Sequence, residues 1–278
     1  MYNNRVRKIN PGFLIILIDQ SEAMGELTPN GDGTLADNLA IVINETIDRL
    51  QLDYTFYNDV IDHYYIPYGC IRILVVGYRG NDTCIICYDW LSELSYDFYY
   101  EKCKFFSEDG LSYKGETIKV VEPVASGSFS LDKALFLIRD ELSSWLTFYG
   151  TKDDLAPLIV NVTTDSYVTD DSRIVPIVNE IMEQKIPDGN PIFYNLRLSY
   201  DKKSLLEFPH ELSHCLDPHA KLLFASSSVI TEDLKNRCPK FFSNREHHEG
   251  SRLFVDNITN RQSLEEMFYF IFEYFRRN

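Results

Sequence analysis

The feature that most constrains the fold is an unbroken apolar run over residues 13–18 (FLIILI), which stops abruptly at Asp19. A strand that is apolar on both faces must be covered on both faces, which is the situation of a central strand in a parallel sheet. In open α/β sheets, ligand-binding residues gather just beyond the carboxyl ends of such strands. We therefore expect Asp19 and the neighbouring Ser21 to lie at the functional edge of a sheet.

Strand-like and helix-like segments alternate along the rest of the chain. Each has apolar residues at strand or helix spacing and is bounded by Gly, Pro, Asn or Asp. The expected strands cover residues 71–78, 84–90, 156–164, 192–198, 221–225 and 252–256, and the expected helices cover residues 35–52, 131–148, 173–184, 232–236 and 263–278. Thr34 is the expected N-cap of the first of these helices.

This alternation predicts a three-layer, doubly wound α/β fold of the Rossmann-like type. The link at residues 80–82 is too short for a parallel crossover, so residues 84–90 are expected to pair antiparallel with residues 71–78. We expect a central, mostly parallel sheet of about six strands, one antiparallel edge strand and helices on both faces. Because no composition break divides the chain, a single domain is expected over residues 10–278, after a tail at residues 1–9.

The charge balance limits the classes of partner. The chain has 42 acidic and 27 basic residues, which gives a formal net charge of −15. Such an excess repels nucleic-acid phosphates and anionic lipid headgroups, so neither nucleic acid nor a membrane is an expected partner. No apolar run approaches the roughly 20 residues that span a bilayer. The amino-terminal segment lacks a signal-peptide cleavage site, so a cytoplasmic location is expected.

Three segments carry hydroxyl and carboxylate side chains close to expected strand or helix ends. They are residues 19–24 (DQSEAM), residues 126–135 (SGSFSLDKAL) and residues 158–171 (LIVNVTTDSYVTDD). In this order and spacing they resemble the three site-forming loops of the von Willebrand factor type A (VWA) family. The resemblance covers most of the chain from about residue 10, and it implies a VWA-like fold whose loops at one end of the sheet bind a partner.

The resemblance also implies a metal-ion-dependent adhesion site at these loops. In the family, two hydroxyls of the first loop and a threonine of the second bind Mg²⁺ or Mn²⁺ directly, and the partner adds a carboxylate. Asp19, Ser21 and Asp165 match the family's pattern, whereas Ala23 stands where a serine is expected.

The second loop also departs from the pattern. Without a gap, Phe129 stands at the threonine position, and a shift of one residue would let Ser128 or Ser130 supply the hydroxyl. The sequence therefore leaves two alternatives open. Either Asp19, Ser21, Ser128 and Asp165 form a weakened Mg²⁺ or Mn²⁺ site, or no cofactor binds and Asp19, Ser21 and Asp165 tie the loops together by hydrogen bonds.

Residues around the same edge form an expected partner-binding rim, which comprises Glu22, Glu26, Phe129, Asp170 and Asp171. If its carboxylates converge, this rim would attract a basic protein surface even without a metal. The chain is similar to cytoplasmic bacterial VWA proteins that act as scaffolds in multi-protein systems. The resemblance thus implies a non-catalytic protein–protein interaction module whose partner offers a basic surface or a carboxylate.

The alternative function is a zinc-dependent hydrolase. His210, Glu211 and His214 match the HExxH motif, in which two imidazoles on one helix face bind zinc and the glutamate acts as base. Pro209 precedes the motif and Pro218 follows closely, so the sequence disfavours the helix that this chemistry needs. We expect the motif to lie in a surface connection between two late strands.

Two aromatic segments offer a further alternative. Residues 88–106 and the final helix are dense in Tyr, Phe and Trp. Either the two segments pack on each other in the core, or they leave an aromatic surface that supports docking or self-association.

Overall fold

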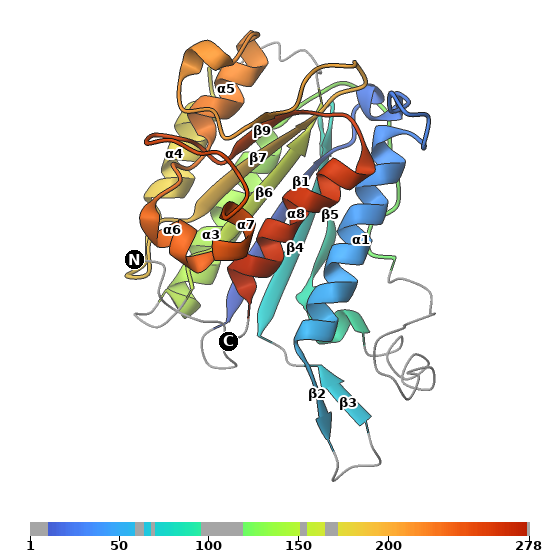
Figure 1. Ribbon diagram of the computed structural model, residues 1–278. Coiled ribbons are helices and arrows are strands. Elements are labelled where there is room, and N and C mark those ends of the chain that lie inside the picture. Colours follow the sequence, from blue (N-terminus) through green and yellow to red (C-terminus); the bar gives the residue numbers. More distant parts are fainter. Residues whose placement is uncertain are drawn as a thin grey trace.

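The centre of the molecule is a seven-stranded sheet with the order β5-β4-β1-β6-β7-β9-β8 (Figure 1). The computed structural model describes residues 11–58, 64–67, 70–95, 119–150, 155–164 and 172–276. The strands of this sheet are β1 (Gly12–Asp19), β4 (Ile71–Arg79), β5 (Asp82–Trp90), β6 (Leu158–Thr163), β7 (Ile192–Leu198), β8 (Leu206–Glu207) and β9 (Phe254–Ile258). β1 pairs in parallel with both β4 and β6, which confirms that the first apolar run is a central strand.

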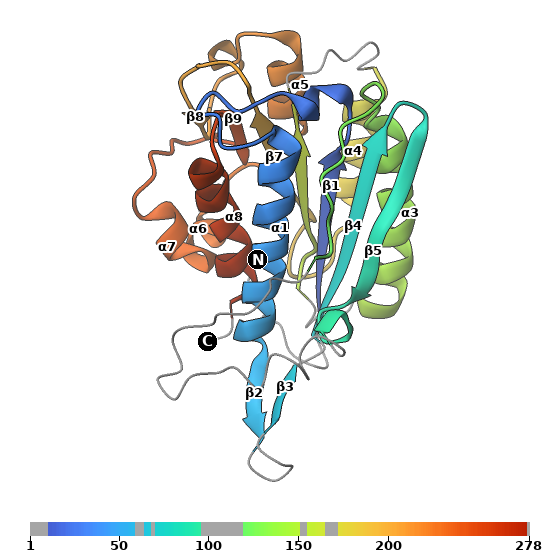
Figure 2. The same ribbon diagram turned by 90° about the vertical axis from the view of Figure 1, so that its right-hand side faces the viewer.

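Helices cover both faces of the sheet, as predicted (Figure 2). One face carries α1 (Leu35–Asp53), α6 (Glu232–Arg237), α7 (Pro239–Phe242) and α8 (Arg261–Phe275), and the other carries α3 (Asp132–Tyr149), α4 (Ile174–Glu183) and part of α5 (Pro218–Ser226). A separate antiparallel hairpin is formed by β2 (Thr55–Asn58) and β3 (Tyr64–Pro67). No helix in the described part of the chain is long and apolar enough to cross a membrane.

The side chains of β1 explain why its apolar run is continuous. Leu14, Ile16 and Ile18 are buried in the core against α1 and α8, and the residues between them are buried in the core against α3 and α4. Since successive side chains of a strand point to opposite faces, a strand that is covered on both faces needs apolar residues at every position. The apolar run stops at Ile18, and Asp19 is the last residue of β1.

Thr34 is the N-cap of α1, as predicted, and the structure shows that a capping box fixes the start of this helix. The Thr34 hydroxyl accepts a hydrogen bond from the Asp37 amide at 3.1 Å, and the Asp37 carboxylate accepts one from the Thr34 amide at 3.0 Å. Further along α1, the buried side chain of Asn44 binds a segment distant in sequence. Its amide oxygen accepts hydrogen bonds from the Val120 and Val121 amides, each at 2.9 Å, so α1 holds the segment that leads to the second loop.

The sheet differs from the prediction at one edge. The two-residue strand β8, which the sequence did not predict, pairs antiparallel with β9 and gives the sheet a second antiparallel edge. So short a strand leaves no periodic pattern in a sequence.

The predicted strand at residues 221–225 is wrong, since these residues lie in helix α5. Asp217 is the N-cap of α5 and accepts a hydrogen bond from the Ala220 amide at 2.8 Å, and Pro218 occupies the first turn. A short apolar run is compatible with a buried strand or a buried helix segment, and the Asp-Pro start signal decides for the helix.

A buried arginine anchors the start of α5 to the sheet. Arg197 on β7 is 3 % exposed and binds Asp256 of β9 at 2.6 and 3.0 Å. Its two Nη atoms also donate to the Asp217 carboxylate, both at 2.8 Å, so that Nη2 binds both carboxylates. Burial raises the pKa of Asp217, but the hydrogen bonds from Arg197 and the Ala220 amide outweigh this effect and bring the pKa to about 2.

A chain of buried polar side chains crosses the middle of the sheet. The Tyr78 hydroxyl donates to the amide oxygen of Asn161 at 3.1 Å, and the Asn161 amide nitrogen donates to the amide oxygen of Asn195 at 2.8 Å. The Asn195 nitrogen in turn donates to the Leu223 carbonyl and the Ser227 hydroxyl of the α5 region. These bonds connect β4, β6 and β7 with α5.

The aromatic residues of α8 are mainly core. Phe268, Phe270 and Phe275 are buried, while Tyr269 is 38 % exposed. Trp90 does not pack on α8, because its ring contacts Trp145 of α3 at 5.9 Å on the opposite face of the sheet. Residues 96–106 of the other aromatic segment lie outside the described residues.

Candidate functional site

The ends of β1, β4 and β6 lie together at the carboxyl end of the sheet, at the top of Figure 1, and the second loop lies beside them. Backbone hydrogen bonds fix the second loop there. The Ser126 amide donates to the Gln20 carbonyl at 2.8 Å, the Glu22 amide to the Gly127 carbonyl at 2.8 Å, and the Gly80 amide to the Ser128 carbonyl at 2.5 Å. The second loop is therefore bound both to the end of β1 and to the hairpin between β4 and β5.

Asp19 lies at the centre of these loops and is fully buried. One carboxylate oxygen accepts a hydrogen bond from the Ser21 amide at 2.8 Å. The other accepts bonds from the Thr164 amide at 3.2 Å and the Thr164 hydroxyl at 2.8 Å. Burial raises the pKa of Asp19, and the hydrogen bonds from Ser21 and Thr164 oppose this rise. Asp19 thus binds the first loop through one carboxylate oxygen and the third segment through the other.

Phe129 of the second loop is half-buried and packs against the core. The ring contacts Tyr78 edge-on, with centroids 5.6 Å apart, and His219 with centroids 5.4 Å apart. Tyr78 is fully buried and pairs with Asp19 in the strand register. Burial, together with the negative charge of Asp19, raises the pKa of Tyr78 well above its usual value. A phenyl ring in this place offers no oxygen to a cation.

The described residues do not fit the divalent cation that the VWA resemblance implies. A Mg²⁺ ion requires near-octahedral oxygen ligands. Ala23 has no hydroxyl, Phe129 packs on Tyr78, and both Asp19 oxygens are bound by protein donors. No group of three His, Cys, Asp or Glu side chains that could hold a metal ion occurs among the described residues. Asp165, Asp170 and Asp171 lie outside those residues.

The other predicted site residues are spread over the loop surface. Ser21 is buried beneath it, whereas Ser128 is exposed beside the β4–β5 hairpin at Gly80. Glu22 and Glu26 are exposed in the first loop. Next to Glu26, Leu27 exposes 63 % of its surface although its backbone bridges to Thr34. The stretch between β1 and α1 therefore exposes two carboxylates and one apolar side chain.

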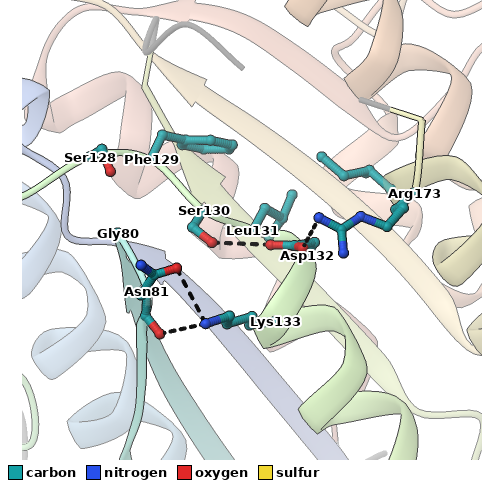
Figure 3. Close-up of a pocket in the computed structure, with 10 residues that line it drawn as sticks. Gly80, Asn81, Ser128, Phe129, Ser130, Leu131, Asp132, Lys133 and Arg173 are labelled. Atoms are coloured by element: carbon teal, nitrogen blue, oxygen red, sulfur yellow. Dashed lines mark hydrogen bonds and ion pairs between the residues drawn. The ribbon is translucent and has the colours of Figure 1, made fainter. Parts of the chain in front are cut away.

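A polar pocket of about 320 Å³ opens beside the second loop (Figure 3). Its charged and polar lining includes Asn81 of the hairpin, Ser128 and Ser130 of the second loop, Asp132 and Lys133 at the start of α3, and Arg173 before α4. The Lys133 ammonium donates to the Asn81 carbonyl at 2.9 Å, and the Arg173 guanidinium binds the Asp132 carboxylate at 3.1 Å. Asp19 is not part of this lining.

The HExxH residues do not form a zinc-protease helix. Within the motif only the three residues Leu212–His214 are helical, in a 3₁₀ turn, and they lie in the connection between β7 and β9, as predicted. The His210 ring contacts His214 with centroids 4.7 Å apart and His248 with centroids 4.5 Å apart. His248 is a neighbour that sequence spacing did not identify. This arrangement lacks the helix face on which the motif's chemistry depends.

Sequence reasoning missed the residues that complete the site. Thr164 stands directly before Asp165 in the third segment, and its role as donor to Asp19 depends on a contact between distant loops. Asn81, Lys133 and Arg173 come from three separate segments and meet only in the fold. The available signals were the turn at residues 80–82 and the expected helix starts at residues 131 and 173, which place each residue near an element end but do not bring them together.

Comparisons with known proteins give likenesses of fold. No family model matches the chain, and no curated protein matches it. The structure is similar to the SpRpn10 VWA domain, with 12% identity, a TM-score of 0.47, and coverage of 92% of this chain and 93% of that chain. It is also similar to the manganese-loaded TRAP protein of Plasmodium vivax, with 13% identity, a TM-score of 0.34, and coverage of 68% and 57%.

A third likeness is to the N-terminal domain of TFIIH p34, with 9% identity, a TM-score of 0.33, and coverage of 69% of this chain and 82% of that chain. This chain thus spans little more than half of the TRAP chain and most of the other two. Identities this low say nothing of function. The mixed α/β fold follows from the strand order and register described above.

Proposed function

We propose that this chain is a non-catalytic protein-binding module of VWA type. It engages a protein partner through the loops at the carboxyl end of its sheet, and it does so without a cation. The observation that carries the proposal is the hydrogen bonding of Asp19, whose two carboxylate oxygens bind the first and third loops.

In this proposal, direct hydrogen bonds hold the loops in place, and no cation is needed to order them. A surface that is already ordered loses little conformational entropy when a partner binds. Here Asp19 joins the first and third loops, and backbone bonds from Ser126, Glu22 and Gly80 hold the second loop against them. The first loop is further closed on itself, since the Thr28 amide donates to the Gly33 carbonyl at 3.0 Å.

The composition of the loop surface suits a protein partner. Specific interfaces centre on apolar side chains surrounded by polar residues. Leu27 supplies an exposed apolar group, and Glu22 and Glu26 supply exposed charges on the same stretch of chain between β1 and α1. In this proposal Asp170 and Asp171 extend the acidic rim, and Phe129 forms its apolar base. The acidic side of the surface favours a partner with a basic patch.

The test is affinity capture of partners by the full chain, with chemical crosslinking and mass spectrometry, in the presence of EDTA. Leu27→Asp places a charge at the proposed apolar centre. Phe148→Asp is the matched control, because Phe148 is 77 % exposed near the end of α3 that lies far from the loops. We expect a partner that is retained in EDTA, lost with Leu27→Asp and kept with Phe148→Asp.

Three results would overturn this proposal. Loss of the partner in EDTA, restored by Mg²⁺ or Mn²⁺, would show that a cation is needed. Equal effects of the two substitutions would show that the loop surface is not the binding face. Crosslinks from the partner to the opposite end of the sheet would also place the binding face away from the loops.

A further inference from the structure

We propose that the pocket between the β4–β5 hairpin and the starts of α3 and α4 binds one carboxylate from the protein partner. The group is the side chain of an Asp or Glu residue, and the pocket binds it without a metal. The inference rests on the proposed function and adds to it the chemistry of one contact.

The charges that line the pocket favour a monoanion. Lys133 and Arg173 carry positive charges and Asp132 carries a negative one, which leaves one net positive charge in the pocket. A carboxylate neutralises that charge, whereas a phosphate group with nearly two negative charges leaves an excess. The excess is unfavourable in a chain whose formal net charge is −15. The pocket therefore fits a carboxylate better than a phosphate.

The hydrogen-bond donors of the pocket exceed its acceptors. An arginine has five N–H donors and a lysine has three. Arg173 binds Asp132 through one nitrogen and leaves 60 % of its side chain exposed. Lys133 directs its ammonium to the Asn81 carbonyl and side-chain oxygens, at 2.9 and 3.4 Å. The remaining donors can bind a carboxylate that enters from solvent, and Arg173 can do so with two parallel bonds.

The two cations are held in place before a ligand arrives. Figure 3 shows Lys133 and Arg173 on either side of Asp132, with Asn81 fixing the first and Asp132 fixing the second. The Ser130 hydroxyl donates to the other oxygen of Asp132 at 3.0 Å, which orients that carboxylate as well. Restrained cations lose less side-chain entropy on binding than free ones do.

The walls of the pocket suit a short acidic side chain. Phe129, Leu131 and Ile174 contribute apolar surface between the charged groups. The methylene groups of Asp or Glu can contact this surface while the carboxylate reaches the cations. The volume of about 320 Å³ accommodates such a side chain with part of its backbone.

The experiment is a titration of the ¹⁵N-labelled full chain in EDTA, followed by amide chemical shifts. The probes are aspartate blocked as N-acetyl methylamide, the equally blocked asparagine, and inorganic phosphate, all at one ionic strength. We expect saturable shifts with blocked aspartate at Gly80, Asn81 and Ser128 and none with blocked asparagine. Phosphate is expected to bind more weakly than blocked aspartate.

Substitutions assign the binding to the two cations. Lys133→Gln and Arg173→Gln are each expected to weaken the binding of blocked aspartate by about fivefold, because each removes one charge-assisted bond. The matched control is Lys185→Gln, which removes an exposed lysine just beyond the other end of α4 and is expected to change nothing.

The outcomes separate this inference from the proposed function. The inference fails if blocked aspartate gives no saturable shifts up to its solubility limit, or if blocked asparagine or phosphate binds as well. It also fails if the double variant Lys133→Gln, Arg173→Gln binds the probe like the wild type. If blocked aspartate does not bind while Leu27→Asp still abolishes partner capture, the carboxylate site is refuted and the proposed function stands.

Discussion

The substitution Asp19→Ala removes the acceptor for two backbone amides, those of Ser21 and Thr164, and for the Thr164 hydroxyl. All of these groups are buried. A buried donor left without a partner costs roughly 1–3 kcal/mol, so the two amides alone cost about 2–6 kcal/mol. Removing a buried carboxylate offsets part of that loss. We expect the free energy of unfolding to fall by about 3 kcal/mol.

The assay is urea unfolding of both proteins in EDTA and again with Mg²⁺ or Mn²⁺ added. A cation that binds only the folded state at 100 times its dissociation constant adds about 2.7 kcal/mol to stability. If Asp19 only ties loops together, neither protein gains stability from the cation, and the difference between them stays the same. Glu22→Ala is the control, because it removes an exposed carboxylate of the same loop and is expected to be nearly neutral.

A clear gain in wild-type stability with Mg²⁺ or Mn²⁺, absent from Asp19→Ala, would refute this reasoning. So would an Asp19→Ala protein that is as stable as the wild type in EDTA. The first result would identify a cation site, and the second would show that the hydrogen bonds of Asp19 contribute nothing to stability.

Three further predictions concern stability and local order. Burial raises the pKa of Asp19, so between that pKa and 3.8 the folded protein binds a proton that the unfolded chain does not. The wild type should therefore gain stability relative to Asp19→Asn as pH falls through this range, which urea unfolding at each pH measures. A difference independent of pH would contradict this. Arg197→Met leaves the Asp256 carboxylate buried without its cation and should cost about 3–5 kcal/mol in thermal or urea unfolding; a loss below about 1 kcal/mol would contradict it. Asn44→Ala removes the acceptor for the amides of residues 120–121, so their hydrogen exchange should accelerate about tenfold while that of β1 is unchanged. Equal exchange at residues 120–121 in both proteins would show that Asn44 does not hold this segment.

Local chemistry explains what the sequence could predict. The apolar run before Asp19 places β1 in the centre of the sheet, and Thr34 marks the start of α1. The short link at residues 80–82 gives the antiparallel pairing of β4 and β5. In each case neighbouring residues carry the whole signal, because strand burial, capping and tight turns depend on local backbone geometry.

Contacts between distant segments explain what it could not predict. The bond between Asp19 and Thr164 joins residues 145 positions apart, and no spacing rule connects them. The pocket likewise needs Asn81, Lys133 and Arg173, which come together only when the hairpin, α3 and α4 are packed. The predicted strand at residues 221–225 is wrong because so short an apolar run shows no periodicity that distinguishes a strand from a helix.

The polar chain from Tyr78 through Asn161 to Asn195 has a consequence for how this sequence can diverge. Each bond runs in the same direction: the Tyr78 hydroxyl donates to the Asn161 oxygen, the Asn161 nitrogen to the Asn195 oxygen, and the Asn195 nitrogen to the Leu223 carbonyl. Replacing one asparagine by an apolar residue leaves the other, which is buried, without one of its hydrogen-bond partners. Replacing both by apolar residues removes the buried donor and acceptor of that bond together. In an alignment of relatives, we therefore expect positions 161 and 195 to covary, either both amides or both apolar. The two positions would then change together among relatives, a constraint that the variation at either position alone would not reveal.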